Sequence, residues 1–430
     1  MKSLYENFMY AARAHAKWEI ATTQVIVKDR KKLLILLVLF LPILIPAIAH
    51  AGSVLPGFIG GKSSFGPSFF SPTTFYGSIL IGVCAGLITG CIGAGGGFII
   101  TPALMSLGVK GIMAVGTDMF HIFAKAIMGT AVHKKLGNVH VGLAIAFLAG
   151  SFIGVTGGGV LNRAIFNHNP VVSDFVISML YVFMLGFLGF YALADYLKSK
   201  NKIGDEAGDA HGGPSGLTGT ALKMQSIKIP PMITFDEDIY PGGRKISGVF
   251  VALCGGLVGF VAAIMGVGGG FLTFPIFVYA LGVSSFTTVG TDILQIIFTA
   301  GYGSITQYAV YGYVFYTLAM GMLVGSLLGI QIGAITTKVV PGIQIRGFYA
   351  VAILAGFINR LFVLPDKLRI MGYINMSQAT TKTLETIGAV IFFGLVTVFA
   401  LWIISTFVRN IPNLRAEAMA ASSGGKGVSK

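Results

Sequence analysis

Two stretches of this chain share one glycine-rich pattern: Gly93-Ala94-Gly95-Gly96-Gly97-Phe98 and Gly266-Val267-Gly268-Gly269-Gly270-Phe271. Each is followed, in the same order, by a proline, a Leu-Gly-Val tripeptide and a Val-Gly-Thr-Asp tetrapeptide that ends at Asp118 in the first copy and at Asp292 in the second. The offset between the copies is 173 residues at the glycines (93 against 266) and 174 at the threonines (117 against 291). Agreement over so many positions indicates an internal duplication.

The composition around this duplication is that of a membrane protein. Of the 430 residues, 54% are hydrophobic and only 11% are charged, whereas a soluble domain has about 25% charged residues. Too little polar surface remains to cover a water-soluble body, so the sequence predicts an all-α polytopic membrane protein. The net charge of +14 is expected from Lys and Arg retained on cytoplasmic loops, and we expect no nucleic-acid partner.

Helices that cross the bilayer need about 20 mostly apolar residues. Segments of suitable length are 33–50, 112–133, 139–161, 172–197, 286–309, 313–337, 343–364 and 384–408. The tracts 75–109 and 246–283, which contain the glycines, are too long for one crossing. Because adjacent glycines cost about 1 kcal/mol each in a helix, we expect both tracts to break there and to form re-entrant helical hairpins.

These segments predict six units: a cytoplasmic N-terminal segment, an anchor helix, a first transmembrane repeat, a cytoplasmic linker, a second repeat and a C-terminal helix, at 1–32, 33–50, 75–197, 198–245, 246–364 and 384–408. Residues 33–51 could also be a cleaved signal, since Ala49-His50-Ala51 resembles a cleavage site; the long polar segment before them favours a retained anchor.

The charges predict how the two copies are oriented. Lys134 and Lys135 follow the first-copy segment 112–133, whereas the matching second-copy turn at 308–313 has no Lys or Arg. Because Lys and Arg favour the cytoplasmic side, we expect the two copies to be inverted relative to one another, an arrangement that many transporters share. Both termini are then cytoplasmic.

The glycine stretches are the first candidate binding site. A helix break frees backbone N–H groups and exposes the positive end of a half-helix, and both features bind anions. Alternatively, the glycines only allow close helix packing, although packing glycines are usually four residues apart, as at 321, 325, 329 and 333 and at 150, 154 and 158. The candidate glycines are Gly93, Gly95, Gly96, Gly97, Gly266, Gly268, Gly269 and Gly270.

The second candidate site lies on the segment 112–133. Asp118, His121 and Lys125 share one helix face at this spacing, and ionisable groups inside a membrane are functional or paired by default. The cations could attract an anionic solute while an aspartate exchanges a proton. Alternatively, each Thr-Asp pair caps a helix, with Lys125 as the counter-ion of Asp118; the two interpretations can coexist. The candidate side chains are Thr117, Asp118, His121, Lys125, Thr291, Asp292 and Gln295.

Two further polar residues, Asn359 and Arg360, lie near the predicted outer end of 343–364. They could form a gate or anchor lipid headgroups, and their position at a helix end favours the anchor. The chain contains no His-Glu-x-x-His, Gly-x-Ser-x-Gly or Walker motif. We therefore predict no catalytic residues, no metal site and no cofactor.

The duplicated Gly-x-Gly-Gly-Gly-Phe stretch, followed each time by a proline and a Gly-Thr segment, resembles the TauE/SafE family of membrane permeases, often called sulfite exporters, over about residues 75–364. The resemblance implies a bacterial inner-membrane carrier for sulfite, thiosulfate or organosulfonates, with the glycines and both Thr-Asp pairs near the translocation path. We therefore expect a secondary transporter that could be coupled to protons, with a passive anion channel as the alternative. Its expected partners are a small sulfur oxyanion and the lipid bilayer; the exact anion, the direction, the coupling ion and the oligomeric state stay open.

Overall fold

The computed structural model describes the residues in the ranges 57–63, 71–92, 96–136, 139–201, 219–237, 242–336, 339–340 and 342–424. The predicted segment 1–32 and anchor helix 33–50 lie outside these residues, as do Gly93 and Gly95. The described chain is mostly helical, which confirms the predicted helical class.

The first copy forms five α-helices, which are α3 (Pro72–Ile92), α4 (Gly97–Ser106), α5 (Gly111–Leu136), α6 (Val141–His168) and α7 (Pro170–Asn201). The second copy repeats this order and adds two π-helical segments: α9 (Gly248–Met265), α10 (Gly270–Pro275), η4 (Ile276–Leu281), α11 (Ser285–Tyr302), η5 (Gly303–Ala309), α12 (Tyr316–Thr336) and α13 (Gly342–Ile370). The long helix α14 (Gln378–Gly424) follows, and two short 3₁₀ turns, η1 (Gly57–Ile59) and η2 (Gly61–Ser63), precede α3.

The predicted helix breaks at the glycines are confirmed in both copies. In the first, α3 ends at Ile92 and α4 begins at Gly97. In the second, α9 ends at Met265 and α10 begins at Gly270. Gly266, Gly268 and Gly269 have φ angles of 82°, 65° and 91°, in the left-handed region that side chains other than glycine rarely adopt. The second break therefore needs glycine for its backbone conformation.

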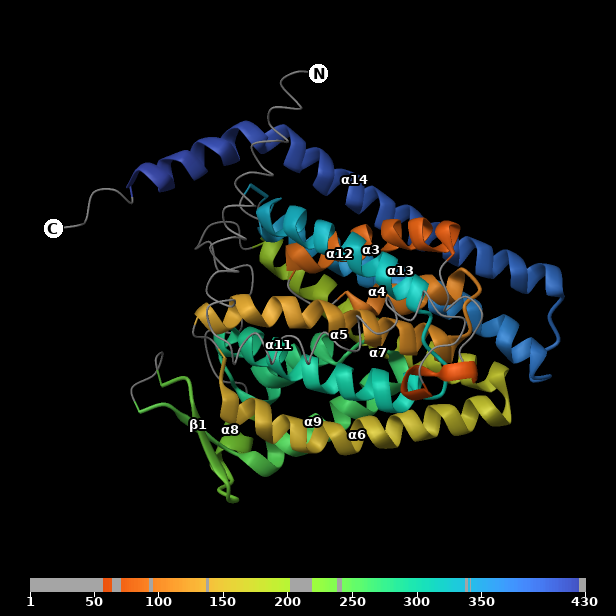
Figure 1. The fold of residues 1–430 in the computed structure, drawn as a ribbon, viewed down its shortest axis with the longest axis horizontal. Coiled ribbons are helices and arrows are strands. Elements are labelled where there is room, and N and C mark those ends of the chain that lie inside the picture. Colours follow the sequence, from red (N-terminus) through yellow and green to blue (C-terminus); the bar gives the residue numbers. More distant parts are fainter. Residues whose placement is uncertain are drawn as a thin grey trace.

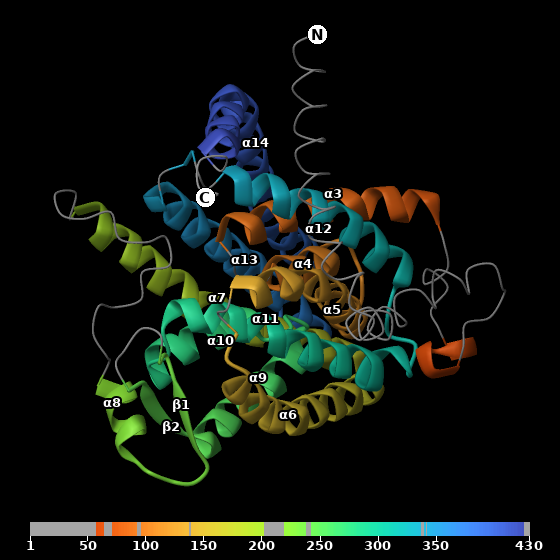
Figure 2. The same cartoon turned by 60° about the vertical axis from the view of Figure 1, so that its left-hand side comes forward.

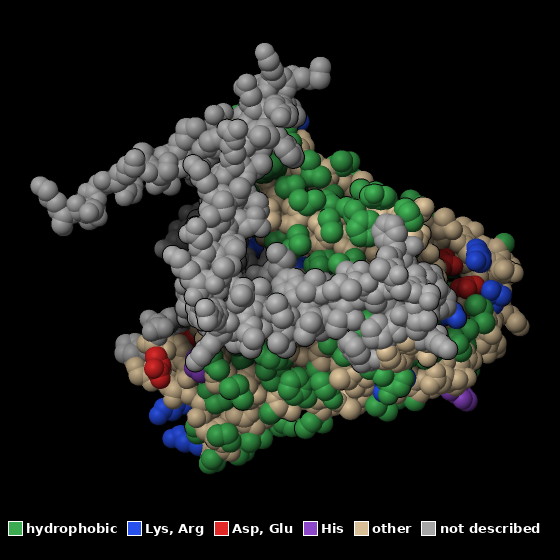
Figure 3. Space-filling model, viewed as in Figure 1, with side chains coloured by type: hydrophobic (Ala, Val, Ile, Leu, Met, Phe, Trp, Pro, Cys, Tyr) green, Lys and Arg blue, Asp and Glu red, His purple; other side chains and the backbone are tan. Residues whose placement is uncertain are grey.

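Seven described helices are long and apolar enough to cross a membrane: α3, α6, α7, α9, α12, α13 and α14. Figure 3 shows hydrophobic side chains along the sides of the helical body, while Lys, Arg, Asp and Glu gather toward its two ends. An apolar belt between two polar ends is the surface that a bilayer requires. The chain is therefore a multi-pass membrane protein. The predicted span 112–133 corresponds to α5, and the predicted span 286–309 corresponds to α11 together with η5, which follows it.

The two copies interlock through pairs of helices (Figures 1 and 2). Helix α3 packs on α12, and its counterpart α9 packs on α6, which is the counterpart of α12. The other two pairs join equivalent helices, α5 with α11 and α7 with α13. Each helix therefore pairs with a helix of the other copy, and the equivalent pairs match, as expected when a two-fold axis relates the two copies.

The pairs differ in direction. Along α3, Gly82 approaches Met322 and Gly90 approaches Ile330, so α3 runs parallel to α12. Residue numbers instead run in opposite directions along α7 and α13, where Gly189 meets Leu354 and Tyr196 meets Gly347. The α5 and α11 pair is also antiparallel, since Phe123 faces Gly301 and Met119 faces Gly303.

The predicted linker 198–245 contains ordered elements that the sequence did not reveal. It holds the helix α8 (Gly219–Ser226) and one antiparallel hairpin of β1 (Met232–Phe235) with β2 (Arg244–Ser247). Asp236, just after β1, accepts hydrogen bonds from the Ser284 backbone N–H at 2.8 Å and from the Ser284 hydroxyl at 2.7 Å. The linker hairpin is thereby attached to the start of α11, and the all-α prediction missed this small sheet.

The predicted packing role of the four-residue glycine ladders is confirmed. A Cβ placed on Gly150 would lie 1.7 Å from the Ala252 carbonyl oxygen, and one on Gly325 would lie 2.0 Å from the Ile79 carbonyl oxygen. These glycines let the backbones of α6 and α9, and of α12 and α3, approach directly.

We predict that Gly150→Ala lowers stability by about 1–3 kcal/mol, because the added methyl group forces two backbones apart. Gly394→Ala is the matched control, since a Cβ there meets nothing within 4 Å. The measurement is the temperature at which half of the purified protein loses its monodisperse elution in size-exclusion chromatography. Equal temperatures for the two variants would contradict the close contact between α6 and α9.

Candidate functional site

The two helix breaks meet at the centre of the protein. A Cβ on Gly97, the first residue of α4, would lie 3.0 Å from the Cα of Val267 in the second break. Gly268 faces the Ile122 side chain on α5, and Gly266 faces Val115 on the same helix. Gly97, Gly266 and Gly268 therefore lie against one helix, α5, whose residues 111–127 are all buried. Of the other sequence-predicted glycines, Gly96 faces α3, Gly269 faces α9 and Gly270 faces α11.

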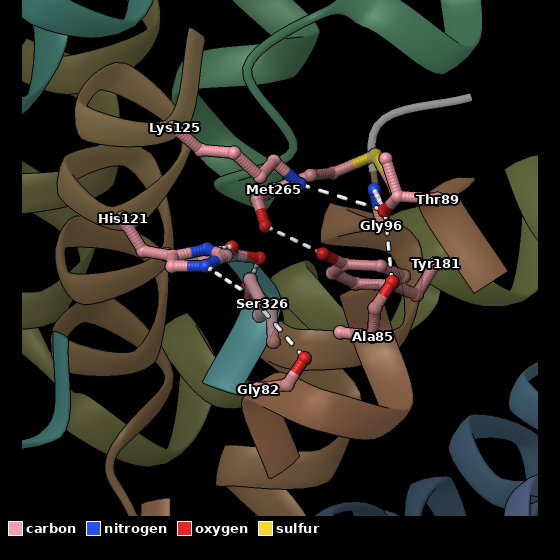
Figure 4. A network of polar contacts seen from close by, with 11 residues as sticks. Gly82, Ala85, Thr89, Gly96, His121, Lys125, Tyr181, Met265 and Ser326 are labelled. Atoms are coloured by element: carbon pink, nitrogen blue, oxygen red, sulfur yellow. Dashed lines mark hydrogen bonds and ion pairs between the residues drawn. The ribbon is translucent and has the colours of Figure 1, made fainter. Parts of the chain in front are cut away.

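Lys125 is aimed at the start of α4 (Figure 4). Its ammonium Nζ lies 3.5 Å from the Thr89 hydroxyl, which also accepts the backbone N–H of Gly96 at 3.0 Å. The Thr89 hydroxyl itself donates to the Ala85 carbonyl. Thus an ammonium group, a backbone N–H and the positive end of α4 converge on one hydroxyl oxygen.

Lys125 is 9% exposed, and no carboxylate of the described residues lies within 4 Å of its ammonium. Asp118 is within electrostatic range, as the counter-ion alternative expects, although the two side chains form no ion pair within 4 Å. A buried cation beside a helix N-terminus is unfavourable unless an anion balances it. The arrangement therefore favours binding of an anion at this position.

Asp118 and His121 form the second part of the cluster, and both are fully buried. One Asp118 oxygen, Oδ2, accepts the Thr101 hydroxyl of α4 at 2.9 Å. His121 Nε2 lies 2.7 Å from the Ser326 hydroxyl of α12, and that hydroxyl in turn donates to the Gly82 carbonyl at 3.3 Å. If the hydroxyl proton is used there, the Nε2–H tautomer of His121 donates to Ser326.

Two polar atoms in this cluster have no hydrogen-bond partner among the residues that the structure describes. They are Asp118 Oδ1 and His121 Nδ1, which face one another at 3.7 Å, too far for a hydrogen bond. Unpaired buried polar atoms cost about 1–3 kcal/mol each and are often retained where a ligand or a proton is handled. Both atoms lie on the α5 face that the sequence predicted.

The matching residues of the second copy form a satisfied network instead. Gln295 donates to Asp292 Oδ1 at 2.7 Å, and Thr299 donates to Gln295 Oε1 at 2.9 Å. Thr299 also contacts the Ser151 hydroxyl of α6 at 3.0 Å. Ser151 is the counterpart of Ser326, so the two networks are built alike. In the described chain, Asp292, Gln295 and Thr299 have no atom among the unpaired ones, whereas the first-copy network has a lysine and two unpaired atoms.

The predicted capping by the two aspartates is wrong for the described residues, and the preceding threonines perform it. Thr117 accepts the backbone N–H of Phe315, just before α12, at 2.9 Å. Thr291 accepts the backbone N–H of His140, just before α6, at 3.0 Å. Each threonine therefore satisfies a backbone donor at the start of a helix in the other copy.

Sequence reasoning missed the partners that other helices supply, namely Thr89, Thr101, Ser151, Tyr181 and Ser326. Single hydroxyl groups on apolar helices carry no pattern that identifies them. Tyr181 is the largest of them; its hydroxyl donates to the Met265 carbonyl at 2.7 Å, immediately before the second break. The serine and threonine positions become informative only when helix pairing is known.

The predicted headgroup anchor at Arg360 is also wrong. Arg360 is 1% exposed and Asn359 is fully buried, so neither side chain reaches the lipid surface. Arg360 instead donates from Nη2 to the Ser106 hydroxyl of α4 at 2.5 Å.

We predict that Gln295→Leu lowers stability by about 1–3 kcal/mol, because Asp292 Oδ1 loses its donor while it stays buried. The control is Gln344→Leu, which removes an exposed amide from α13. Unfolding of the purified protein in mixed micelles measures both variants. If Gln295→Leu is as stable as the control, the second-copy network does not have the structural role assigned to it.

A helical bundle with an apolar belt, paired repeats and a buried polar centre is typical of membrane transporters. A model of the family described as "Sulfite exporter TauE/SafE" matches residues 78–360, and the chain therefore belongs to the sulfite exporter TauE/SafE family of membrane transporters.

Two curated relatives from Bacillus subtilis (strain 168) are similar to the chain. One, named "Probable membrane transporter protein YjnA", is 24% identical over 261 residues, which cover 60% of this chain and 87% of the relative. The other, named "Probable membrane transporter protein YunE", is 25% identical over 268 residues, covering 60% and 86%. No solved structure matches the chain. The region that matches the family model contains both glycine breaks and ends at Arg360.

Proposed function

We propose that this protein is a secondary transporter of a small sulfur-containing anion, of the sulfite, thiosulfate or organosulfonate class, across the bacterial inner membrane. The observation that carries the proposal is the convergence of the Lys125 ammonium and the Gly96 N–H on Thr89 at the start of α4, with no carboxylate within 4 Å of the ammonium in the described chain. An oxyanion there would be held by the Lys125 charge and the dipole of α4, and it would take the place of the Thr89 hydroxyl as acceptor of the Gly96 N–H. The description of the family as sulfite exporters supports an anionic substrate. The names of the two relatives, which call them probable membrane transporters, support transport in general.

Transport needs the site to open to each side in turn, and the arrangement of the copies supports such a motion. We infer that the copies are inverted: the equivalent helices α7 and α13 run antiparallel, as a two-fold axis in the membrane plane requires. The parallel α3 and α12 pair fits the same axis, because its partner pair is α9 and α6. In inverted repeats, rocking of one unit against the other exposes a central site alternately.

The proposed hairpins also follow from these directions. Helix α3 runs toward the first glycine break, and α4 returns from it to the start of α5, where Gly111 donates to Asp174 near the start of α7. Entry and exit on one side is the re-entrant course that the sequence predicts. Irregular backbone at this depth is tolerated because it is enclosed by protein.

The orientation rests on the linker hairpin. Ile233 of β1 contacts Gly142 at the start of α6, and α8, β1 and the end of α14 lie toward one end of the bundle in Figure 1. Since the linker is rich in Lys and Arg, we assign this end to the cytoplasm. The predicted repeats, the linker and the cytoplasmic C-terminus fit this orientation.

We further propose that Asp118 and His121 exchange the coupled proton. Their facing atoms are the unpaired Oδ1 and Nδ1, 3.7 Å apart, and a small approach would let one proton be shared between them. The anion at Lys125 would influence that proton because Lys125 and Asp118 interact electrostatically. The Asp292 network is satisfied, and we assign it a structural role.

We predict that Lys125→Met reduces anion uptake into proteoliposomes at least about tenfold, because charge-assisted hydrogen bonds contribute about 1.5–3 kcal/mol. Lys382→Met, which removes an exposed lysine from α14, is the matched control. The measurement is the initial rate of labelled thiosulfate uptake at equal amounts of folded protein. Unchanged uptake by Lys125→Met would show that the transported anion does not bind at this position.

The same proteoliposomes distinguish a carrier from the alternative, a passive channel. A carrier gives a rate that saturates with anion concentration and shows counterflow, in which unlabelled anion inside accelerates uptake of labelled anion. A rate that stays proportional to concentration, without counterflow, would favour the channel.

We predict that Asp118→Asn abolishes proton movement coupled to anion flux, because the amide cannot exchange a proton. Anion counterflow should persist, since Lys125 is intact. A pH-sensitive dye trapped in proteoliposomes reports the proton, and Asp195→Asn, at a side chain 53% exposed on α7, serves as the control. Full proton movement in Asp118→Asn would contradict the role of this carboxylate.

A further inference from the structure

A second buried cationic cluster lies on α13, at the end of α4 opposite to Lys125. Arg360 donates from Nε to Asn359 Oδ1 at 2.8 Å and from Nη2 to the Ser106 hydroxyl at 2.5 Å. Ser106, the last residue of α4, in turn donates to Asn359 Oδ1 at 3.1 Å. The three side chains form one compact group between α4 and α13.

The charge of this group is not balanced by a direct contact. No carboxylate of the described residues lies within 4 Å of the Arg360 guanidinium. Asp174 and Glu385 are within electrostatic range, but Asp174 is already bound to Lys367 at 3.2 Å and to the Gly111 N–H. A buried guanidinium without a close anion is unfavourable, and a purely structural link would not need a charge.

An unsatisfied donor adjoins the guanidinium. The amide nitrogen Nδ2 of Asn359 is buried and has no hydrogen-bond partner among the described residues, while the oxygen of the same amide accepts from both Arg360 and Ser106. The group therefore presents a positive charge and an N–H donor, and both of its side-chain acceptors, Asn359 Oδ1 and the Ser106 hydroxyl oxygen, already accept hydrogen bonds. These are the properties that select an anion with several oxygens.

Helix α4 connects this group to the Lys125 site. Its ten residues span about 15 Å, with Gly96 at its start, Thr101 in the middle and Ser106 at its end. Tyr181 lies within electrostatic range of both Asp118 and Arg360. The Lys125 ammonium therefore lies beside the start of α4, and the Arg360 guanidinium lies beside its end.

We propose that Arg360, Asn359 and Ser106 form a second binding position for the transported oxyanion, on the outer side of the Lys125 site. This proposal rests on the proposed transport function. The outer side follows from the fold: Arg360 lies within electrostatic range of Asp174 near the start of α7, whereas the linker hairpin contacts the start of α6, which we place at the opposite end of the bundle. An anion from outside would meet Arg360 before it reaches Lys125.

The test uses the side dependence that this position implies. Labelled thiosulfate uptake is measured in right-side-out and in inside-out membrane vesicles, for the wild-type protein and for Asn359→Asp. The aspartate can still accept from Arg360 and Ser106, so the link between α4 and α13 is kept, but its charge repels an anion. We expect the half-saturating concentration to rise about tenfold or more from the outer face and to change less than twofold from the inner face, with unchanged thermal stability.

Two further variants complete the test. Arg360→Met should give the same one-sided effect, whereas Arg369→Met, at an arginine of α13 that is paired with Asp366 at 2.8 Å, should leave both faces unchanged. If Asn359→Asp transports normally from both faces, or is impaired equally from both, the second binding position is wrong. If the wild-type protein takes up no thiosulfate, sulfite or sulfonate from either face, the proposed function itself fails, and this position fails with it.

Discussion

Backbone N–H groups inside a bilayer must be satisfied within the protein, and this constraint governs the structure. Both glycine stretches interrupt helices inside the protein, where an unsatisfied backbone group is costly. The interruptions persist because each is enclosed: the second lies against Gly97 of the first, and both lie against the buried helix α5. Hydrophobic side chains are exposed on the described part of the face that Figure 3 shows.

The duplication explains why the enclosure works and why only one copy has a charged site. Equivalent threonines bond across the copies, Thr117 to Phe315 and Thr291 to His140, so each copy supports the other. Within this shared frame the copies have diverged. Gln295 and Thr299 hydrogen-bond around Asp292 in the second copy, whereas in the first copy Asp118 and His121 keep unpaired atoms among the described residues and Lys125 has no direct ion pair. A frame of two similar halves can therefore hold one asymmetric site.

Much of this architecture could be predicted from the sequence, because it depends on local signals. The free-energy cost of adjacent glycines in a helix predicted both helix breaks. Glycines spaced four residues apart predicted the closely packed helix pairs, and the seven-residue spacing placed Asp118 and Lys125 on one face of α5. The rest depends on which helices become neighbours. The Thr89 and Ser326 contacts, the threonine caps and the burial of Arg360 all come from pairing between the copies, and the hairpin of β1 with β2 lies in a segment whose composition is typical of linkers.

The central claim is that an oxyanion is held between the Lys125 ammonium and the amide at the start of α4. The most direct measurement is an anomalous difference map from crystals grown with selenite, the selenium analogue of sulfite. The account predicts a peak within hydrogen-bonding distance of Lys125 Nζ and the Gly96 backbone N–H, and no equivalent peak beside Thr299 in the second copy. A fully occupied selenite elsewhere in the bundle, with no density beside Lys125, would contradict it.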